Sequence, residues 1–158
     1  MSLQHIWEWS YNSKAIDILR NSKYAIPVIQ SFHLFGLTLV LGTTVVFNAR
    51  LLGIGVRKIS MRTLTDQLWR LAVGGLLLSI TTGILVFIPD PARFAANTAF
   101  KTKLVILTLA ILFHFTIFRR VMRAKAPPGR GPAALVAAAS LTLWFCVGWA
   151  GRGIAFLG

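Results

Sequence analysis

Two histidines lie inside long apolar segments, where polar side chains are costly and need a reason to be present. His33 lies nine residues after Tyr24, and His114 lies thirteen residues after Lys101. If both segments are helices that start near those residues and run the same way, the two depths differ by roughly 6 Å. Helix tilt can absorb a difference of that size. We therefore expect the two imidazoles to face each other across the membrane interior.

Two imidazoles at one depth on facing helices suit the two axial positions of a haem iron. The sequence thus predicts one haem b between the first and third membrane segments, with His33 and His114 as its iron ligands. The alternative is that each histidine only hydrogen-bonds to a neighbouring helix. A covalently attached haem is excluded, because the only cysteine is Cys146 and no Cys-x-x-Cys-His motif exists.

A haem at this position also needs room and partners for its carboxylates. Gly36 follows His33 by about one helical turn, and a small residue there would let a planar group approach closely. Basic residues at the ends of the segments would meet the propionates, and arginine binds carboxylates in a bidentate manner. The candidates are Arg93, Lys101 and Arg152.

Other chemistries have weaker support. A copper site would need Met or Cys beside histidine, but Met1, Met61 and Met122 lie away from the segment centres. The apolar segments contain no Asp or Glu, which argues against an ion-coupled transporter. His5 is either a third ligand or an exposed residue, and we favour exposure. No grouping predicts an enzyme that acts by itself.

The elements that carry these residues are membrane helices. The chain has 158 residues, of which 56% are apolar and only 13% charged, and its mean hydropathy is +0.70. Four charge-free apolar runs are present, and none alternates with period two. The third, Leu104 to Phe118, reaches the length of a span if the basic residues at its ends snorkel. We expect a single all-α transmembrane domain over residues 1–158, an up-down four-helix bundle with spans near 24–49, 69–89, 100–121 and 131–150.

The basic residues predict the orientation. The formal net charge is +13, but the lysines and arginines stand between apolar runs, which favours lipid headgroups over nucleic acid as their partner. Ten of the seventeen lie in the first and third loops. The positive-inside rule places those loops in the cytoplasm and both termini in the periplasm of a bacterial inner membrane.

The residues before the first span are expected to lie along the membrane surface. Trp7, Trp9 and Tyr11 suit the interface, and Ala15, Ile16, Ile18 and Leu19 could form the apolar side of a short helix. A loosely ordered tail is the alternative.

Several motifs together resemble a family of short four-span bacterial membrane proteins of unknown function. They are Ser31 to Gly42, Asp90 to Phe94 with Ala99 to Lys103, and the closing Ala150-Gly151-Arg152. The resemblance covers nearly the whole chain and implies the architecture, with attention to His33, Arg93, Lys103, His114 and Arg152. The His-x-x-Gly sequence at His33 is also similar to the first helix of b-type cytochromes and of copper-resistance membrane proteins.

The favoured hypothesis is a small b-type cytochrome that passes electrons between membrane quinone and an extracytoplasmic redox protein. The second hypothesis is a cofactor-free subunit that anchors or assists a larger complex. A copper or small-solute permease is the third.

Overall fold

The protein is an all-α bundle of long apolar helices, as the sequence predicted. The computed structural model describes residues 12–54, 59–124 and 128–156. Its elements are α2 (Lys14–Asn21), α3 (Ala25–Leu51), α4 (Met61–Phe87), α5 (Pro91–Ala96), α6 (Thr98–Phe113), the π-helix η1 (His114–Phe118), α7 (Arg119–Met122) and α8 (Arg130–Phe156). Four helical stretches within this part of the chain are long and apolar enough to cross a membrane: α3, α4, α6 through α7, and α8.

The second long helix begins well before the predicted span. Ser60 caps it, because the Ser60 side chain accepts a hydrogen bond from the Thr63 backbone N–H at 3.0 Å. The charged residues Arg62, Asp66 and Arg70 are exposed on this first part of α4, so the helix extends beyond its apolar stretch. Dividing the sequence at its charged residues locates the apolar part of a membrane helix. It misses the helical turns that extend beyond that part.

Local signals set the other helix ends. After α3, Gly53 has a φ of +73°, a conformation that L side chains rarely adopt. The Asp90 side chain caps α5, and Pro91 occupies the first turn of that helix. The Asn97 side chain accepts a hydrogen bond from the Phe100 N–H at 3.1 Å, so Asn97 is the N-terminal cap of α6.

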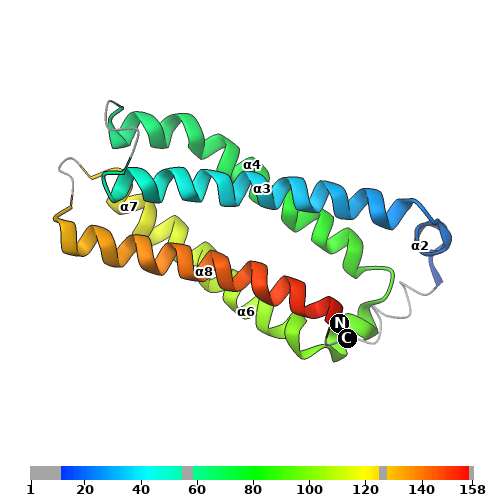
Figure 1. Ribbon diagram of the computed structural model, residues 1–158. Helices are drawn as coiled ribbons and strands as arrows, with labels where there is room; N and C mark the ends of the chain where they lie inside the picture. The colour runs from blue at the N-terminus through cyan, green and yellow to red at the C-terminus, as the bar shows by residue number, and fades with distance from the viewer. Residues whose placement is uncertain (1–11, 55–58, 125–127, 157–158) are drawn as a thin grey trace.

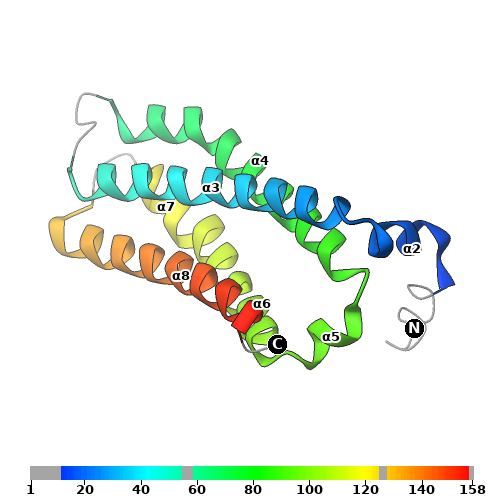
Figure 2. The same ribbon diagram turned by 45° about the vertical axis from the view of Figure 1, so that its right-hand side comes forward.

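The long helices form two pairs, α3 with α4 and α6 with α8, which make the most extensive contacts in the bundle. Gly36 and Gly75 bring α3 and α4 close together. A Cβ atom built on Gly36 would lie 2.8 Å from the Gly75 carbonyl oxygen, and one on Gly75 would lie 2.7 Å from the Leu39 Cβ. Figures 1 and 2 show the two pairs converging near α7 and separating toward α5. We call these the α7 end and the α5 end.

The α7 end is tightly packed. Phe47, Leu51, Leu64, Phe118 and Met122 form the centre of a buried apolar cluster there. The outer surface of the bundle is also apolar, as Leu34, Val105, Leu135 and Phe145 each keep more than 60% of their surface exposed. Apolar side chains on all sides of long helices indicate contact with a lipid bilayer.

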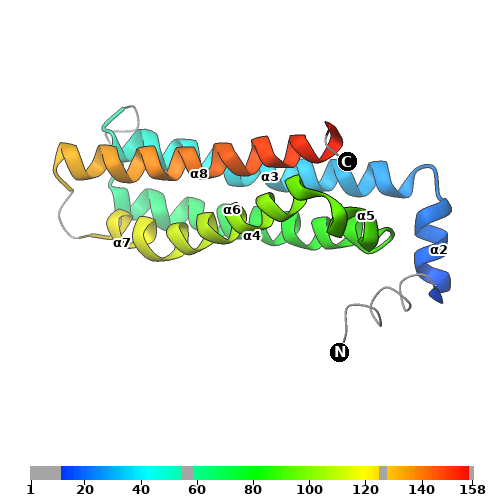
Figure 3. The ribbon, with the colours of Figure 1, turned by 90° about the horizontal axis from the view of Figure 1, so that it is seen from below.

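The short helix α2 lies crosswise to α3 at the α5 end, as Figure 3 shows. Its Arg20 Nε donates a hydrogen bond to the carbonyl oxygen of Pro89 at 3.0 Å, so α2 is attached to the turn after α4. Ile16 is buried, whereas Ile18 is 73% exposed. The predicted interface residues Trp7, Trp9 and Tyr11, and also His5, lie outside the described residues.

Candidate functional site

A large cavity lies at the α5 end, where the helix pairs separate. Its volume is about 790 Å³, which is within the range of cofactor and ligand sites in proteins. Side chains of α3 and α4 form one wall, and those of α5, α6 and α8 form the other. Most of the lining is apolar, and the polar members are Gln30, His33, Ser79, Arg93, Asn97 and Lys103.

His33 is fixed against α4 through one ring nitrogen. Its Nδ1 lies 2.9 Å from the backbone carbonyl oxygen of Ser79 and 3.1 Å from the Thr82 Oγ1. A carbonyl can only accept, so Nδ1 carries the hydrogen. The Thr82 hydroxyl donates to the Leu78 carbonyl at 2.6 Å, which leaves its oxygen free to accept from Nδ1 as well. In the neutral ring the lone pair is therefore on Nε2.

The wall around His33 leaves space for its ring. A Cβ atom on Gly83 of α4 would lie 3.4 Å from the His33 Cε1, so a side chain at Gly83 would press on the imidazole. Metal-binding histidines usually donate their second ring N–H to a carbonyl or carboxylate, which fixes ring orientation and tautomer. His33 has this arrangement, with its lone pair available for an electrophile or a proton donor.

Two cationic residues line the cavity near its α5 end. Lys103 of α6 runs along α8, where its Cε and Nζ would each lie 3.6 Å from a Cβ atom on Gly151. Arg93 comes from α5. None of the described residues that line the cavity is acidic. This part of the cavity therefore favours a ligand with an anionic group.

Three phenylalanine rings form an aromatic wall at the same end. Phe87 and Phe100 are stacked with centroids 5.5 Å apart, and Phe94 lies 5.4 Å from Phe100 and 6.0 Å from Phe87. All three rings line the cavity. The cavity therefore offers both aromatic surface and cationic groups to a ligand.

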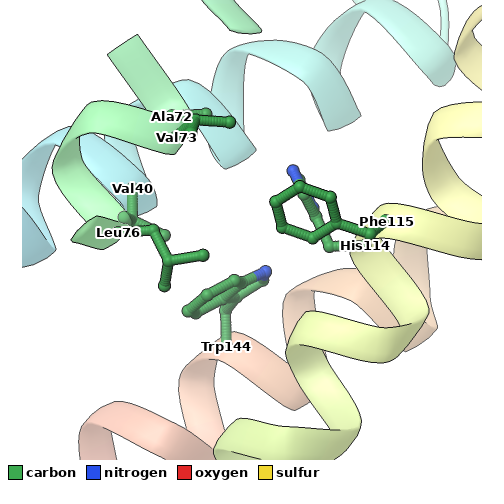
Figure 4. A pocket seen from close by; sticks show the side chains of 7 residues that line it. All are labelled: Val40, Ala72, Val73, Leu76, His114, Phe115 and Trp144. Atoms are coloured by element: carbon green, nitrogen blue, oxygen red, sulfur yellow. The ribbon is translucent and has the colours of Figure 1, made fainter. Parts of the chain in front are cut away.

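Val40, Leu76 and Trp144 form the floor of this cavity, because they also line a second and much smaller one. The small cavity has a volume of about 10 Å³ and is bounded on the other side by His114 and Phe115 (Figure 4). The two histidines therefore line different cavities.

His114 lies inside an aromatic cluster. It begins the π-helix η1 and is only 4% exposed. Its ring is stacked on Trp69 at 5.5 Å and on Phe118 at 5.1 Å, and Trp144 meets it edge-on at 6.1 Å. These distances join ring centroids. The π-helix places both His114 and Phe118 toward the bundle interior, and π-bulges often occur at functional sites.

The structure does not bring His33 and His114 together. His114 lines the small cavity with Val40, which lies seven residues beyond His33, or about 10 Å along α3. Its ring also approaches that of Phe47, seven residues further on, at 6.4 Å between centroids. The predicted depth difference of 6 Å was too small, because α6 begins at Thr98, before Lys101, and α3 begins at Ala25.

The other predicted cofactor residues divide into two groups. Arg93 lines the cavity, whereas Lys101 and Arg152 are exposed and do not line it. Gly36 serves the contact between α3 and α4 and is not a cavity residue.

Lys103 also lines the cavity; the family resemblance drew attention to this residue, but it was not among the residues predicted to bind the cofactor. The signal was present, because Phe100, Lys103, Leu104 and Leu107 are spaced as one face of a helix, and all four line the cavity. Lys101 is two residues away and faces elsewhere.

Comparison with known proteins confirms the resemblance to a family of unknown function. Neither a curated protein nor a solved structure matches the chain. A family model matches residues 7–157, which is nearly the whole sequence. The chain belongs to DUF6644, a family of unknown function.

Proposed function

We propose that the cavity at the α5 end binds one haem b and that the protein is a small membrane electron-transfer protein. The observation that carries this proposal is the state of His33. Its Nδ1–H is donated to the Ser79 carbonyl and its lone pair is on Nε2, in a cavity of about 790 Å³. This is the form of histidine that binds iron.

The remaining lining supports an amphiphilic, carboxylate-bearing ligand. Arg93 and Lys103 would hold the two propionates, through charge-assisted hydrogen bonds at the membrane surface. The Phe87, Phe94 and Phe100 rings would contact the porphyrin face or edge. When bound, a haem supplies a one-electron redox centre whose potential depends on axial ligation and burial.

His33 is the sole histidine among the described residues that line the cavity. This proposal therefore differs from the hypothesis drawn from the sequence in the number of histidines that bind the iron. One imidazole, from His33, holds the iron, and His114 belongs to the aromatic cluster below the floor.

The charge distribution supports an orientation. The loops and helix ends at the α7 end hold Arg50, Arg62, Arg70, Arg119, Arg120, Arg123 and Arg130, among others. By the positive-inside rule this end faces the cytoplasm of a bacterial inner membrane, and the cavity faces the periplasm. A redox group there would exchange electrons with membrane quinone and with an extracytoplasmic redox protein.

The test is a reduced-minus-oxidised visible spectrum of the detergent-purified protein, expressed with added haem precursor. We expect haem b bands in the wild type and in His114→Phe, which keeps a ring between Trp69 and Phe118 but cannot bind iron. His33→Ala should lose most of the bound haem.

Circular dichroism and gel filtration would establish that each variant is folded. A colourless wild-type protein, or equal haem content in His33→Ala, would refute the proposal. A colourless protein that copurifies with a partner would favour the cofactor-free subunit.

A further inference from the structure

Three buried polar atoms in the bundle have no hydrogen-bond partner among the described residues. They are the Thr44 Oγ1, the Asn48 Oδ1 and the His114 Nδ1. Their residues are 1%, 1% and 4% exposed. Buried polar atoms nearly always have a partner, so each exception calls for an explanation, and a bound water is one. All three lie in the half of the bundle toward the α7 end, away from the large cavity.

The Asn48 amide joins the two helix pairs. Its Nδ2 donates to the Thr44 carbonyl on α3 at 2.8 Å and to the Ser140 Oγ on α8 at 3.1 Å. Both amide hydrogens are thereby used, and Ser140 is fully buried. The Asn48 Oδ1 remains as an acceptor, and the Thr44 hydroxyl, one turn earlier on the same helix face, remains as a donor.

A water-sized space lies beside His114. The small cavity of about 10 Å³ is close to the volume that one water molecule needs. Figure 4 shows a ring nitrogen of His114 and the indole nitrogen of Trp144 at its edges. The remaining lining side chains are apolar.

We propose that the interior of the α7 half binds ordered water, at the Thr44–Asn48–Ser140 group and beside His114. Water can accept from the Thr44 hydroxyl and donate to the Asn48 Oδ1, whereas a cation cannot accept a hydrogen bond. The described groups are neutral, and a cation without a carboxylate partner would be costly in this environment. The water bridges Thr44 and Asn48 of α3, and the Asn48 amide donates directly to Ser140 of α8. The water thus supports the residue that joins the helix pairs near the α7 end. This proposal does not depend on haem.

A pair of adjacent threonines tests the inference by thermal unfolding in detergent. Valine has nearly the shape of threonine but lacks the hydroxyl. In a hydrated site, Thr44→Val removes a partner of the water, and we expect the Tm to fall by about 3 °C. Thr43→Val is the matched control, because the Thr43 hydroxyl already donates to the Leu39 and Val40 carbonyls of its own helix. In a dry site, Thr44→Val would remove an unsatisfied hydroxyl and the Tm would rise.

Water-edited solid-state NMR of protein labelled with ¹⁵N-asparagine, in lipid bilayers, gives a direct measurement. We expect magnetisation transfer from water to the Asn48 side-chain amide, and weaker transfer in Thr44→Val. The Asn48 signal is assigned by its disappearance in Asn48→Leu. No transfer to Asn48 in the wild type would overturn the inference, whatever the Tm values. A Tm that drops when sodium is replaced by choline would also overturn it, in favour of a bound cation.

Discussion

The Nδ1 of His33 on α3 lies 2.9 Å from the backbone carbonyl oxygen of Ser79 on α4. This contact joins the two helices that form one wall of the large cavity, and it sets which ring nitrogen carries the lone pair. The Thr82 Oγ1, at 3.1 Å, is the second partner of the same nitrogen. The orientation of His33 therefore depends on a backbone carbonyl and a hydroxyl of α4.

Thr82→Val removes the second partner and leaves the Ser79 carbonyl in place. Loss of a group that orients a metal-binding histidine commonly lowers affinity about 10- to 100-fold. We expect haem affinity to fall by about tenfold, the lower limit, since one of the two contacts remains. Titration of haem into haem-depleted protein measures this affinity. Thr81→Val is the control, because Thr81 is exposed on the next position of α4. Equal losses in the two variants would show that the Thr82 contact does not position His33.

The coordination of the iron is a second prediction. With His33 as the one imidazole at the cavity, the reduced haem should bind carbon monoxide, with a shift of its Soret band. A haem held by both His33 and His114 would remain low-spin and would bind carbon monoxide poorly. If the wild-type spectrum is low-spin and becomes high-spin in His114→Phe, the two-histidine site expected from the sequence is correct and the one-histidine site is wrong.

Lys103 and Lys101 form a natural pair for the third prediction. Lys103 lines the cavity and Lys101 is exposed outside it. Hydrogen bonds to a charged group contribute about 1.5–3 kcal/mol, so Lys103→Gln should weaken haem binding about tenfold or more. Lys101→Gln should leave haem binding unchanged in the same titration. The assignment of Lys103 to a propionate fails if both substitutions have the same effect.

The sequence was sufficient for the architecture because membrane helices carry a strong signal. Apolar runs without charged residues mark each span, and Asn97, Pro91 and Gly53 mark helix ends in ways that can be recognised without coordinates. The helix starts were less certain, because Ser60 extends α4 into a charged segment.

The arrangement of the site was harder to predict, because it depends on where each helix starts and on how the pairs diverge. A change of three residues in the start of α6 moves His114 by about 4.5 Å along the axis. The Gly36–Gly75 contact is also invisible in the sequence, since a glycine in a membrane helix can face lipid, a ligand or another helix. Gly36 was expected at the cofactor, whereas it lies against α4.

The α3–α4 contact gives the fourth prediction. It compares the adjacent residues Gly75, which lies in the contact, and Gly74, which lies outside it. A Cβ atom on Gly75 would lie 2.7 Å from the Leu39 Cβ and 2.9 Å from the Gly36 carbonyl oxygen, so the helices would have to move apart. Nothing lies within 4 Å of a Cβ atom on Gly74. We expect Gly75→Ala to destabilise the protein by about 1–3 kcal/mol, and Gly74→Ala not to lower its stability.

Thermal unfolding in detergent measures both variants. Because His33 and its partners Ser79 and Thr82 lie on the two helices that would separate, Gly75→Ala should also reduce haem binding, and Gly74→Ala should not. If Gly75→Ala were as stable as Gly74→Ala, the close approach of α3 and α4 would be wrong. If it were destabilised but bound haem normally, the α3–α4 spacing would not control the position of His33.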